Sequence, residues 1–184
     1  MLTATVKHPT SPMNAVDALL HHEFGELFRL LKREREARVI VLTGEGKAFS
    51  AGGDFGWFPA LRDTAALDEL RRDAKQMIWD LLDVEVPIVC GLNGAAAGLG
   101  ASIALLCDVI VMSERAVIID PHVNVGLVAG DGGAAVWPLL LGPLVFVLRR
   151  RRPRRAALVP YPPRCRSPAS GGGHDAGMAR LSAG

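Results

Sequence analysis

The chain has 184 residues, of which 49% are hydrophobic and 22% are charged, with a formal net charge of +2. This length allows one domain with a substantial core, and the three cysteines lack zinc-type spacing, which favours a reduced, cytoplasmic protein. Residues 1–148 hold 12 Lys and Arg against 18 Asp and Glu, whereas residues 149–184 hold 9 against 1. We therefore expect a globular core over 1–148 and a separate basic tail over 149–184.

The start of the chain predicts a strand over residues 2–7, a proline-fixed turn, and then a helix that runs to about Arg35. Asn14 is placed to cap this helix, with Asp17 completing a weak capping box. Histidine and prolines between residues 8 and 12 interrupt any apolar leader. The two longest uncharged runs elsewhere are short or broken by proline, so we expect no membrane span.

A second strand is predicted over Arg38–Thr43, followed by a glycine-rich loop over 44–54. The aromatic residues in 55–60 form either an apolar lid or a plain packing cluster. A charged amphipathic helix is expected over 63–82, and its charges are interpreted as a solvated face.

The most informative stretch is Val86–Met112, which predicts a buried strand, a turn at Asn93-Gly94 and a helix over 97–107 that is buried on every side. A glycine-rich helix start presents backbone N–H groups at the positive end of a helix dipole, which suits an anion or a developing oxyanion. Tight packing of a core helix explains the same small residues equally well. Further strands are expected over 108–112 and 116–119.

Two segments, RVIVLTGEGKAFSAGGD and PIVCGLNGAAAGLGASIALLCDVIV, resemble the signature segments of the crotonase superfamily of enoyl-CoA hydratases and isomerases. A third, IIDPHVNVGLVAGDGGAAVWPLLLG, follows in the order found in that family. The resemblance runs from Leu2 to Leu144. It implies a crotonase-like (ClpP/crotonase) α/β fold, a spiral of repeated ββα units, which we expect to be incomplete at both ends.

The resemblance also implies a substrate-binding set of main-chain groups. The N–H groups of Gly53 and Leu99 would be the two oxyanion donors, with Gly98 beside the second. The backbone at Ala51 would hold the adenine of coenzyme A. Asp54 belongs to the same loop, and a helix-capping role is favoured for it over catalysis.

The acid–base positions depart from the family pattern. Hydratases carry glutamates where this chain has Ser102 and His122, and a histidine can serve as an acid or base near neutral pH. His122 is therefore the main catalytic candidate, with Asp131 and Ser102 as further candidates. Asp131 has an equally supported interpretation as the N-cap of a helix over 132–141. A hydrolytic triad of Ser102, His122 and Asp131 is a minor alternative.

The expected function is that of an enoyl-CoA hydratase/isomerase-type lyase or isomerase of fatty acid metabolism, whose oxyanion hole stabilises an enolate of an acyl-CoA thioester. Coenzyme A belongs to the substrate, and no metal or separate cofactor is expected. The family implies a homo-oligomer, a trimer or hexamer, without nucleic acid as partner. The alternative is a truncated, non-catalytic remnant that binds coenzyme A weakly.

The tail over 149–184 is rich in Arg, Pro, Ala, Ser and Gly, and this composition predicts disorder. A change of reading frame in GC-rich coding sequence is the favoured explanation. A basic arm for nucleic acid or anionic lipid is the other.

Overall fold

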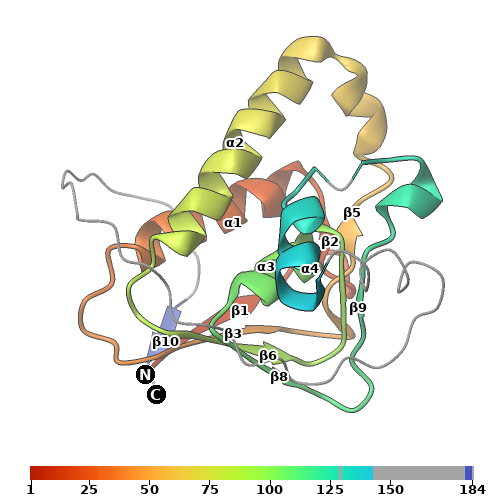
Figure 1. The fold of residues 1–184 in the computed structure, drawn as a ribbon. Coiled ribbons are helices and arrows are strands. Elements are labelled where there is room, and N and C mark those ends of the chain that lie inside the picture. Colours follow the sequence, from red (N-terminus) through yellow and green to blue (C-terminus); the bar gives the residue numbers. More distant parts are fainter. Residues whose placement is uncertain (129, 143–180, 184) are drawn as a thin grey trace.

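The computed structural model describes residues 1–128, 130–142 and 181–183, which form a mixed α/β fold built on parallel strands (Figure 1). The largest sheet has five strands in the order β10-β1-β3-β6-β8. Four of them are parallel to one another: β1 (Leu2–Val6), β3 (Ile40–Gly44), β6 (Ile88–Leu92) and β8 (Val109–Met112).

Each of these four parallel strands is followed by one or two short strands outside the large sheet and then by a helix. The short strands form two small parallel sheets, one of β2 (Ala15–Val16) with β5 (Gly52–Gly53), the other of β4 (Ala48–Ser50), β7 (Ala95–Ala97) and β9 (Ile118–Ile119). The helices are α1 (Ala18–Leu31), α2 (Thr64–Leu82), α3 (Leu99–Leu106) and α4 (Gly133–Leu141), with 3-10 turns η1 (Phe58–Arg62) and η2 (His122–Val125). The predicted repetition of ββα units is confirmed.

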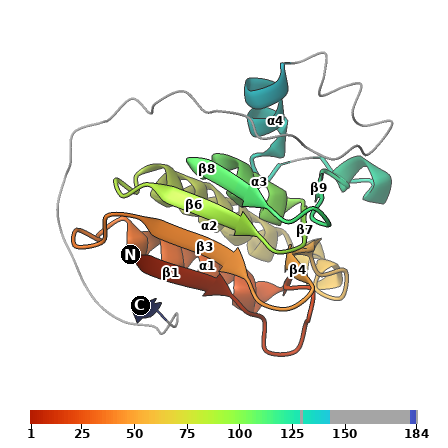
Figure 2. The same cartoon turned by 90° about the horizontal axis from the view of Figure 1, so that it is seen from below.

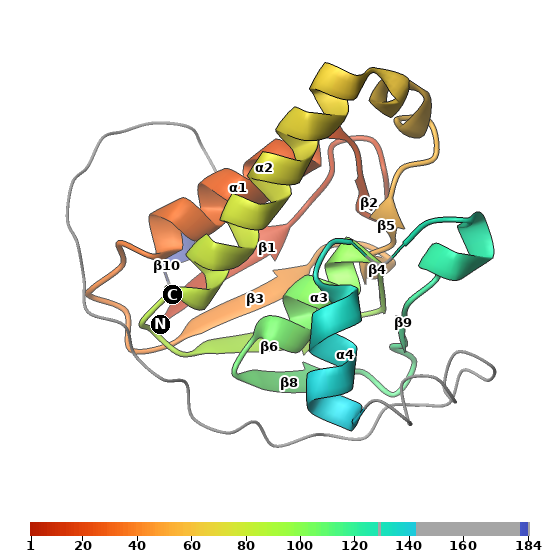
Figure 3. The ribbon, with the colours of Figure 1, turned by 45° about the horizontal axis from the view of Figure 1, so that its top comes forward.

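The core lies between the large sheet and helices α1, α2 and α3, which cover one face of it (Figures 2 and 3). Alternate residues of each central strand point into this layer, as the period of two requires. In β3 these are Ile40 and Leu42, both fully buried. In α1 the matching residues follow helical spacing, with Phe24, Phe28 and Leu31 buried.

The start of α1 differs from the prediction that Asn14 caps it. Asp17 is the N-cap, and its carboxylate accepts a hydrogen bond from the N–H of Leu20 at 2.9 Å. Asn14 has a positive φ of 49° and is buried, so its side chain serves another purpose described below. The helix also ends at Leu31, before the predicted end at Arg35.

Strand β1 is the outermost of the four parallel strands and pairs antiparallel with β10 (Leu181–Ala183). These three residues belong to the basic tail predicted over 149–184. An edge strand offers unpaired backbone groups to any segment that can lie beside it, whatever its side chains. Residues 143–180 and 184, which hold the rest of the expected tail, lie outside the described residues.

An ion pair joins α1 to α2. The sequence predicts that the charged residues of α2 form a solvated face, but Asp80 is buried. Its carboxylate accepts hydrogen bonds from the Lys32 ammonium at 2.5 Å and from the Gln76 amide at 3.0 Å. The bond to Asp80 raises the pKa of Lys32, against the opposing effect of partial burial.

Replacing Lys32 with methionine should lower the free energy of unfolding by about 1–3 kcal/mol, because the buried Asp80 carboxylate loses its cation. Urea denaturation measures the change in the free energy of unfolding, with one m-value used for all variants. The control is Lys7→Met, which breaks the exposed pair with Glu45 and should cost less than about 1 kcal/mol. Equal effects of the two substitutions would contradict a special role for the buried pair.

Candidate active site

The glycine-rich turn before α3 leaves backbone N–H groups without intrahelical acceptors. The helix begins at Leu99, two residues later than predicted, because Ala95–Ala97 form strand β7 between β4 and β9. Gly98 is the N-cap, with φ 51° and ψ −122°, a conformation that favours glycine. Leu99 is the first helical residue, so its N–H has no carbonyl four residues earlier within the helix. All eight residues of α3 are buried, as predicted.

The predicted loop over 44–54 contains two short strands and runs beside this turn. Gly52 has φ 79°, and a β-carbon on it would lie 2.8 Å from the carbonyl oxygen of Ala97 and 3.5 Å from the nitrogen of Gly98. A β-carbon on Gly100 would lie 2.7 Å from that of Ser50. Only glycine permits this approach, so the segments that carry Gly53 and Leu99 are held together by close backbone packing.

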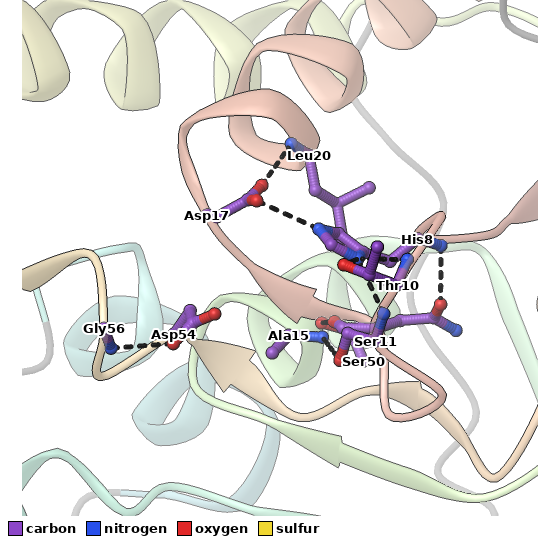
Figure 4. Close-up of polar contacts among 10 residues, drawn as sticks. His8, Thr10, Ser11, Ala15, Asp17, Leu20, Ser50, Asp54 and Gly56 are labelled. Carbon is purple, nitrogen blue, oxygen red and sulfur yellow. Dashed lines mark hydrogen bonds and ion pairs between the residues drawn. The ribbon is translucent and has the colours of Figure 1, made fainter.

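Two other loop residues of the predicted binding set make backbone contacts with the N-terminal segment. The N–H of Ala51 donates to the carbonyl of Met13 at 2.9 Å, and the N–H of Asp54 donates to the carbonyl of Val16 at 2.8 Å. The Asp54 carboxylate accepts from the N–H of Gly56 at 2.7 Å (Figure 4). Asp54 thus stabilises the turn after β5, and the residue at the N-cap of η1 is Trp57.

The aromatic segment 55–60 is partly exposed and partly packed. Phe55 is 67% exposed and meets the ring of Phe58 edge-on, with centroids 5.4 Å apart. A β-carbon on Gly53 would lie 2.8 Å from the Phe58 ring, so this ring covers the end of β5. Trp57 packs against His21, whose pKa is lowered by burial. The segment 55–60 therefore places an apolar surface next to the glycine-rich loop.

Asn14 fixes the position of the loop, a role that sequence reasoning missed. Its buried amide lies within hydrogen-bond distance of the carbonyl oxygens of Glu45, Ala48 and Phe49, at 2.9, 3.0 and 3.2 Å. The main-chain carbonyl of Asn14 accepts a hydrogen bond from the hydroxyl of Ser50 at 2.8 Å. Asparagine adopts a positive φ more readily than most residues, as Asn14 does here. An Asn close after a proline-rich turn is therefore the sequence signal for such a role.

His8 supports the same region from the other side (Figure 4). Its Nδ1 accepts from the N–H groups of Thr10 and Ser11, at 3.2 and 2.8 Å. The Nε2 atom therefore carries the proton in the contact with Asp17 Oδ2 at 3.0 Å. This network ties the turn before β2 to the first turn of α1, and it explains why the side chain of His8 is largely covered.

The structure brings together the three predicted catalytic residues, which come from different elements. His122 begins η2, Asp131 precedes α4 and Ser102 lies within α3. His122 Nε2 is 3.1 Å from Asp131 Oδ2, and the Ser102 hydroxyl is 3.3 Å from Asp131 Oδ1. Asp120 adds a second carboxylate, with its Oδ1 at 2.5 Å from His122 Nδ1.

This order of contacts argues against the hydrolytic triad. A nucleophilic serine must give its proton to the histidine, but Ser102 contacts the aspartate instead. Its hydroxyl is also within 3.3 Å of the carbonyl of Gly98, inside a helix whose residues are all buried. The prediction that Asp131 caps the following helix is also wrong, because Gly132 is the N-cap of α4 and no side chain caps it.

The two carboxylates control the charge of His122. The hydrogen bond to Asp131 is the main cause that raises the pKa of His122 from 6.5 to about 9; burial of the ring acts against it, and the bond to Asp120 adds to it. At neutral pH the imidazole is therefore a cation. The protonated ring can donate a proton at that pH. The sequence did not indicate this, because it does not show the contacts with Asp131 and Asp120.

The charged cluster lies beside the turn that precedes α3. A β-carbon on Gly98 would lie 3.5 Å from His122 Cε1, 3.6 Å from His122 Nε2 and 3.7 Å from Asp131 Oδ2. A proton donor, a carboxylate and the first backbone N–H groups of a helix thus meet at one glycine. In the described part of the chain no group of three or more His, Cys, Asp or Glu side chains has the geometry to hold a metal ion. Among the same residues, no helix combines the length and hydropathy needed to cross a bilayer.

Comparisons with known proteins agree on one family. A family model described as enoyl-CoA hydratase/isomerase matches residues 2–145. A protein of Rhodobacter capsulatus named "Probable enoyl-CoA hydratase" is 36% identical over 131 residues, 71% of this chain and 49% of the relative. Carnitinyl-CoA dehydratase of Citrobacter koseri is 32% identical over 146 residues, 79% of this chain and 54% of that enzyme.

A solved structure extends this likeness to the fold. The crystal structure of an enoyl-CoA hydratase/isomerase from Mycobacterium paratuberculosis superposes with a TM-score of 0.75 at 36% identity, covering 86% of this chain and 62% of that one. The chain spans about half the length of the curated relatives it matches.

Proposed function

Because the chain belongs to the enoyl-CoA hydratase/isomerase family, we propose that it acts on an acyl-CoA thioester and stabilises the enolate formed from it. The N–H groups of Gly53 and Leu99 donate to the thioester oxygen, on which negative charge develops. The close packing of Gly52 against Ala97 and Gly98 supports this assignment, because it holds the two donor segments side by side.

The acid–base unit in this proposal is the pair of His122 and Asp131. Nε2 of the imidazolium holds a transferable proton, and the Asp131 carboxylate beside it can accept one. In isomerisation of a 3-enoyl-CoA, Asp131 takes a proton from C2 and His122 gives one to C4. The proton on Asp131 then passes to His122, which restores both groups and leaves a 2-enoyl-CoA.

Ser102 favours isomerisation over addition of water. The family resemblance implies a glutamate at this position in hydratases, and a serine hydroxyl is no general base at neutral pH. Here that hydroxyl contacts a backbone carbonyl and the Asp131 carboxylate. The observation that carries the proposal is the placement of the His122–Asp131 pair within 4 Å of a β-carbon position on Gly98, next to the N–H of Leu99.

Calorimetric titration with two coenzyme A derivatives tests the proposal. One is a ketone analogue in which a methylene group replaces the thioester sulfur and the carbonyl is kept. The other is a thioether that lacks the carbonyl. Two hydrogen bonds to the carbonyl, each contributing about 1 kcal/mol, should make the ketone bind roughly tenfold or more tightly.

The outcomes separate the two candidate functions. A preference for the ketone supports an oxyanion site. Equal binding of both compounds would instead support the alternative, a non-catalytic protein that holds coenzyme A. Failure of a folded sample to bind either compound would overturn the proposed function.

A further inference from the structure

Asp120 lies where β9 ends, in the local sequence Asp120-Pro121-His122. Its Oδ1 atom accepts two hydrogen bonds from the same residue, one from the backbone N–H of His122 at 3.2 Å and one from the ring Nδ1 at 2.5 Å. The side chain of Asp120 is only 8% exposed. Main chain and imidazole of His122 are thus held by one buried carboxylate.

The hydrogen bonds determine where the protons of His122 lie. An ionised carboxylate only accepts, so a ring nitrogen that contacts one must donate. Nδ1 contacts Asp120, and Nε2 contacts Asp131 at 3.1 Å. Both ring nitrogens therefore carry protons, and the imidazole is a cation held between two carboxylates.

The second carboxylate oxygen of Asp120 makes this side chain depend more strongly on the positive charge of His122. Oδ2 is buried and has no hydrogen-bond partner among the described residues. A buried carboxylate with one unpartnered oxygen is costly unless a cation compensates its charge. The imidazolium of His122 is the cation that the structure places against it.

We propose that Asp120 is a positioning residue, which fixes the orientation of the His122 ring and keeps Nδ1 protonated so that Nε2 faces Asp131 beside Gly98. Its significance for catalysis rests on the proposed function, but its effect on His122 does not. The groups that act on the charge of His122 are Asp131 and Asp120, while the hydroxyl of Ser102 acts on Asp131. Proton transfer by His122 then depends on Asp120 through its contact with the imidazole ring.

A purely structural role for Asp120 predicts something different. Its Oδ1 also supports the turn that begins η2 through the backbone N–H of His122. Replacing Asp120 with asparagine keeps an oxygen for that bond and removes the charge. A residue that only supports the turn would leave the titration of His122 unchanged by this substitution.

The experiment is an NMR titration of the full chain with the ring nitrogens of His122 labelled. Asp120→Asn should lower the pKa of His122 by about 1–3 units, the usual effect of losing an adjacent opposite charge. The control is Asp68→Asn, which removes a carboxylate paired with Arg71 on the exposed side of α2 and should change nothing at His122. An unchanged His122 titration in folded Asp120→Asn would overturn the proposal.

A measurement on the unmodified chain tests the same inference if that variant does not fold. The nitrogen chemical shifts of His122 at pH 7 should show protons on both Nδ1 and Nε2. A wild-type ring with an unprotonated Nδ1 at pH 7 is incompatible with the proposal. Neither readout requires binding of a coenzyme A derivative, so failure of the proposed function and failure of this inference are distinguishable.

Discussion

Replacing His122 with glutamine should lower kcat for isomerisation of a 3-enoyl-CoA by about 10²- to 10⁴-fold, the range that a positioned acid–base group contributes. Glutamine can still contact a neighbouring carboxylate, but it has no proton to exchange. Formation of the conjugated enoyl thioester, followed by its absorbance, gives the rate. Affinity for the ketone analogue should change little, because the oxyanion donors are main-chain groups.

The pH profile shows which form of His122 acts. Its pKa is raised to about 9, so the imidazolium is present below that value and is lost as pH rises through it. The rate should therefore fall above about pH 9 in the wild type, and this decline should vanish in His122→Gln. The exposed His22→Gln on α1 is the control and should keep the wild-type profile. A rate that climbs towards pH 9 would instead make His122 the base.

Replacing Leu99 with proline should lower kcat by about 10²- to 10³-fold beyond the effect of Leu99→Ala. Proline is tolerated at the first position of a helix, where it removes only the N–H proposed as an oxyanion donor. Leu99 is 7% exposed, so both substitutions lose the packing of its side chain. The comparison therefore isolates the N–H, and kcat values are measured on the same 3-enoyl-CoA.

The titration with the two coenzyme A derivatives gives an independent readout on these variants. Leu99→Ala should keep the preference for the ketone, and Leu99→Pro should lose most of it. Equal kcat and equal preference in the two variants would remove Leu99 from the oxyanion site. Thermal unfolding of both variants shows whether a difference in kcat comes from a difference in stability.

Much of the fold follows from local pattern. Apolar runs rich in β-branched residues predict the strands observed as β3 and β6, and amphipathic spacing predicts α2. The segment Ala95–Ala97 has no strand signal in the sequence, and the predicted helix over 97–107 already includes Ala97. In the structure it lies as β7 between β4 and β9, so tertiary pairing overrides propensity.

The candidate site was predictable as a set of residues but not as a network. Sequence alone identified His122, Asp131 and Ser102 through family motifs. It did not identify Asp120, because its value lies in a contact with the His122 ring that depends on the turn after β9. It assigned Asp131 a capping role as an alternative, because spacing cannot show that the carboxylate turns toward His122 instead of the helix.

The amide of Asn14 has a consequence for how this molecule opens. It lies within hydrogen-bond distance of three carbonyls in the loop just before Ala51 and Gly53, while Ala51 and Asp54 bond back to the segment that leads into α1. Neither segment can detach without breaking the bonds of the other, so the two should open and close as a single cooperative unit. A protease that reaches one of these segments would then find the other exposed at the same moment.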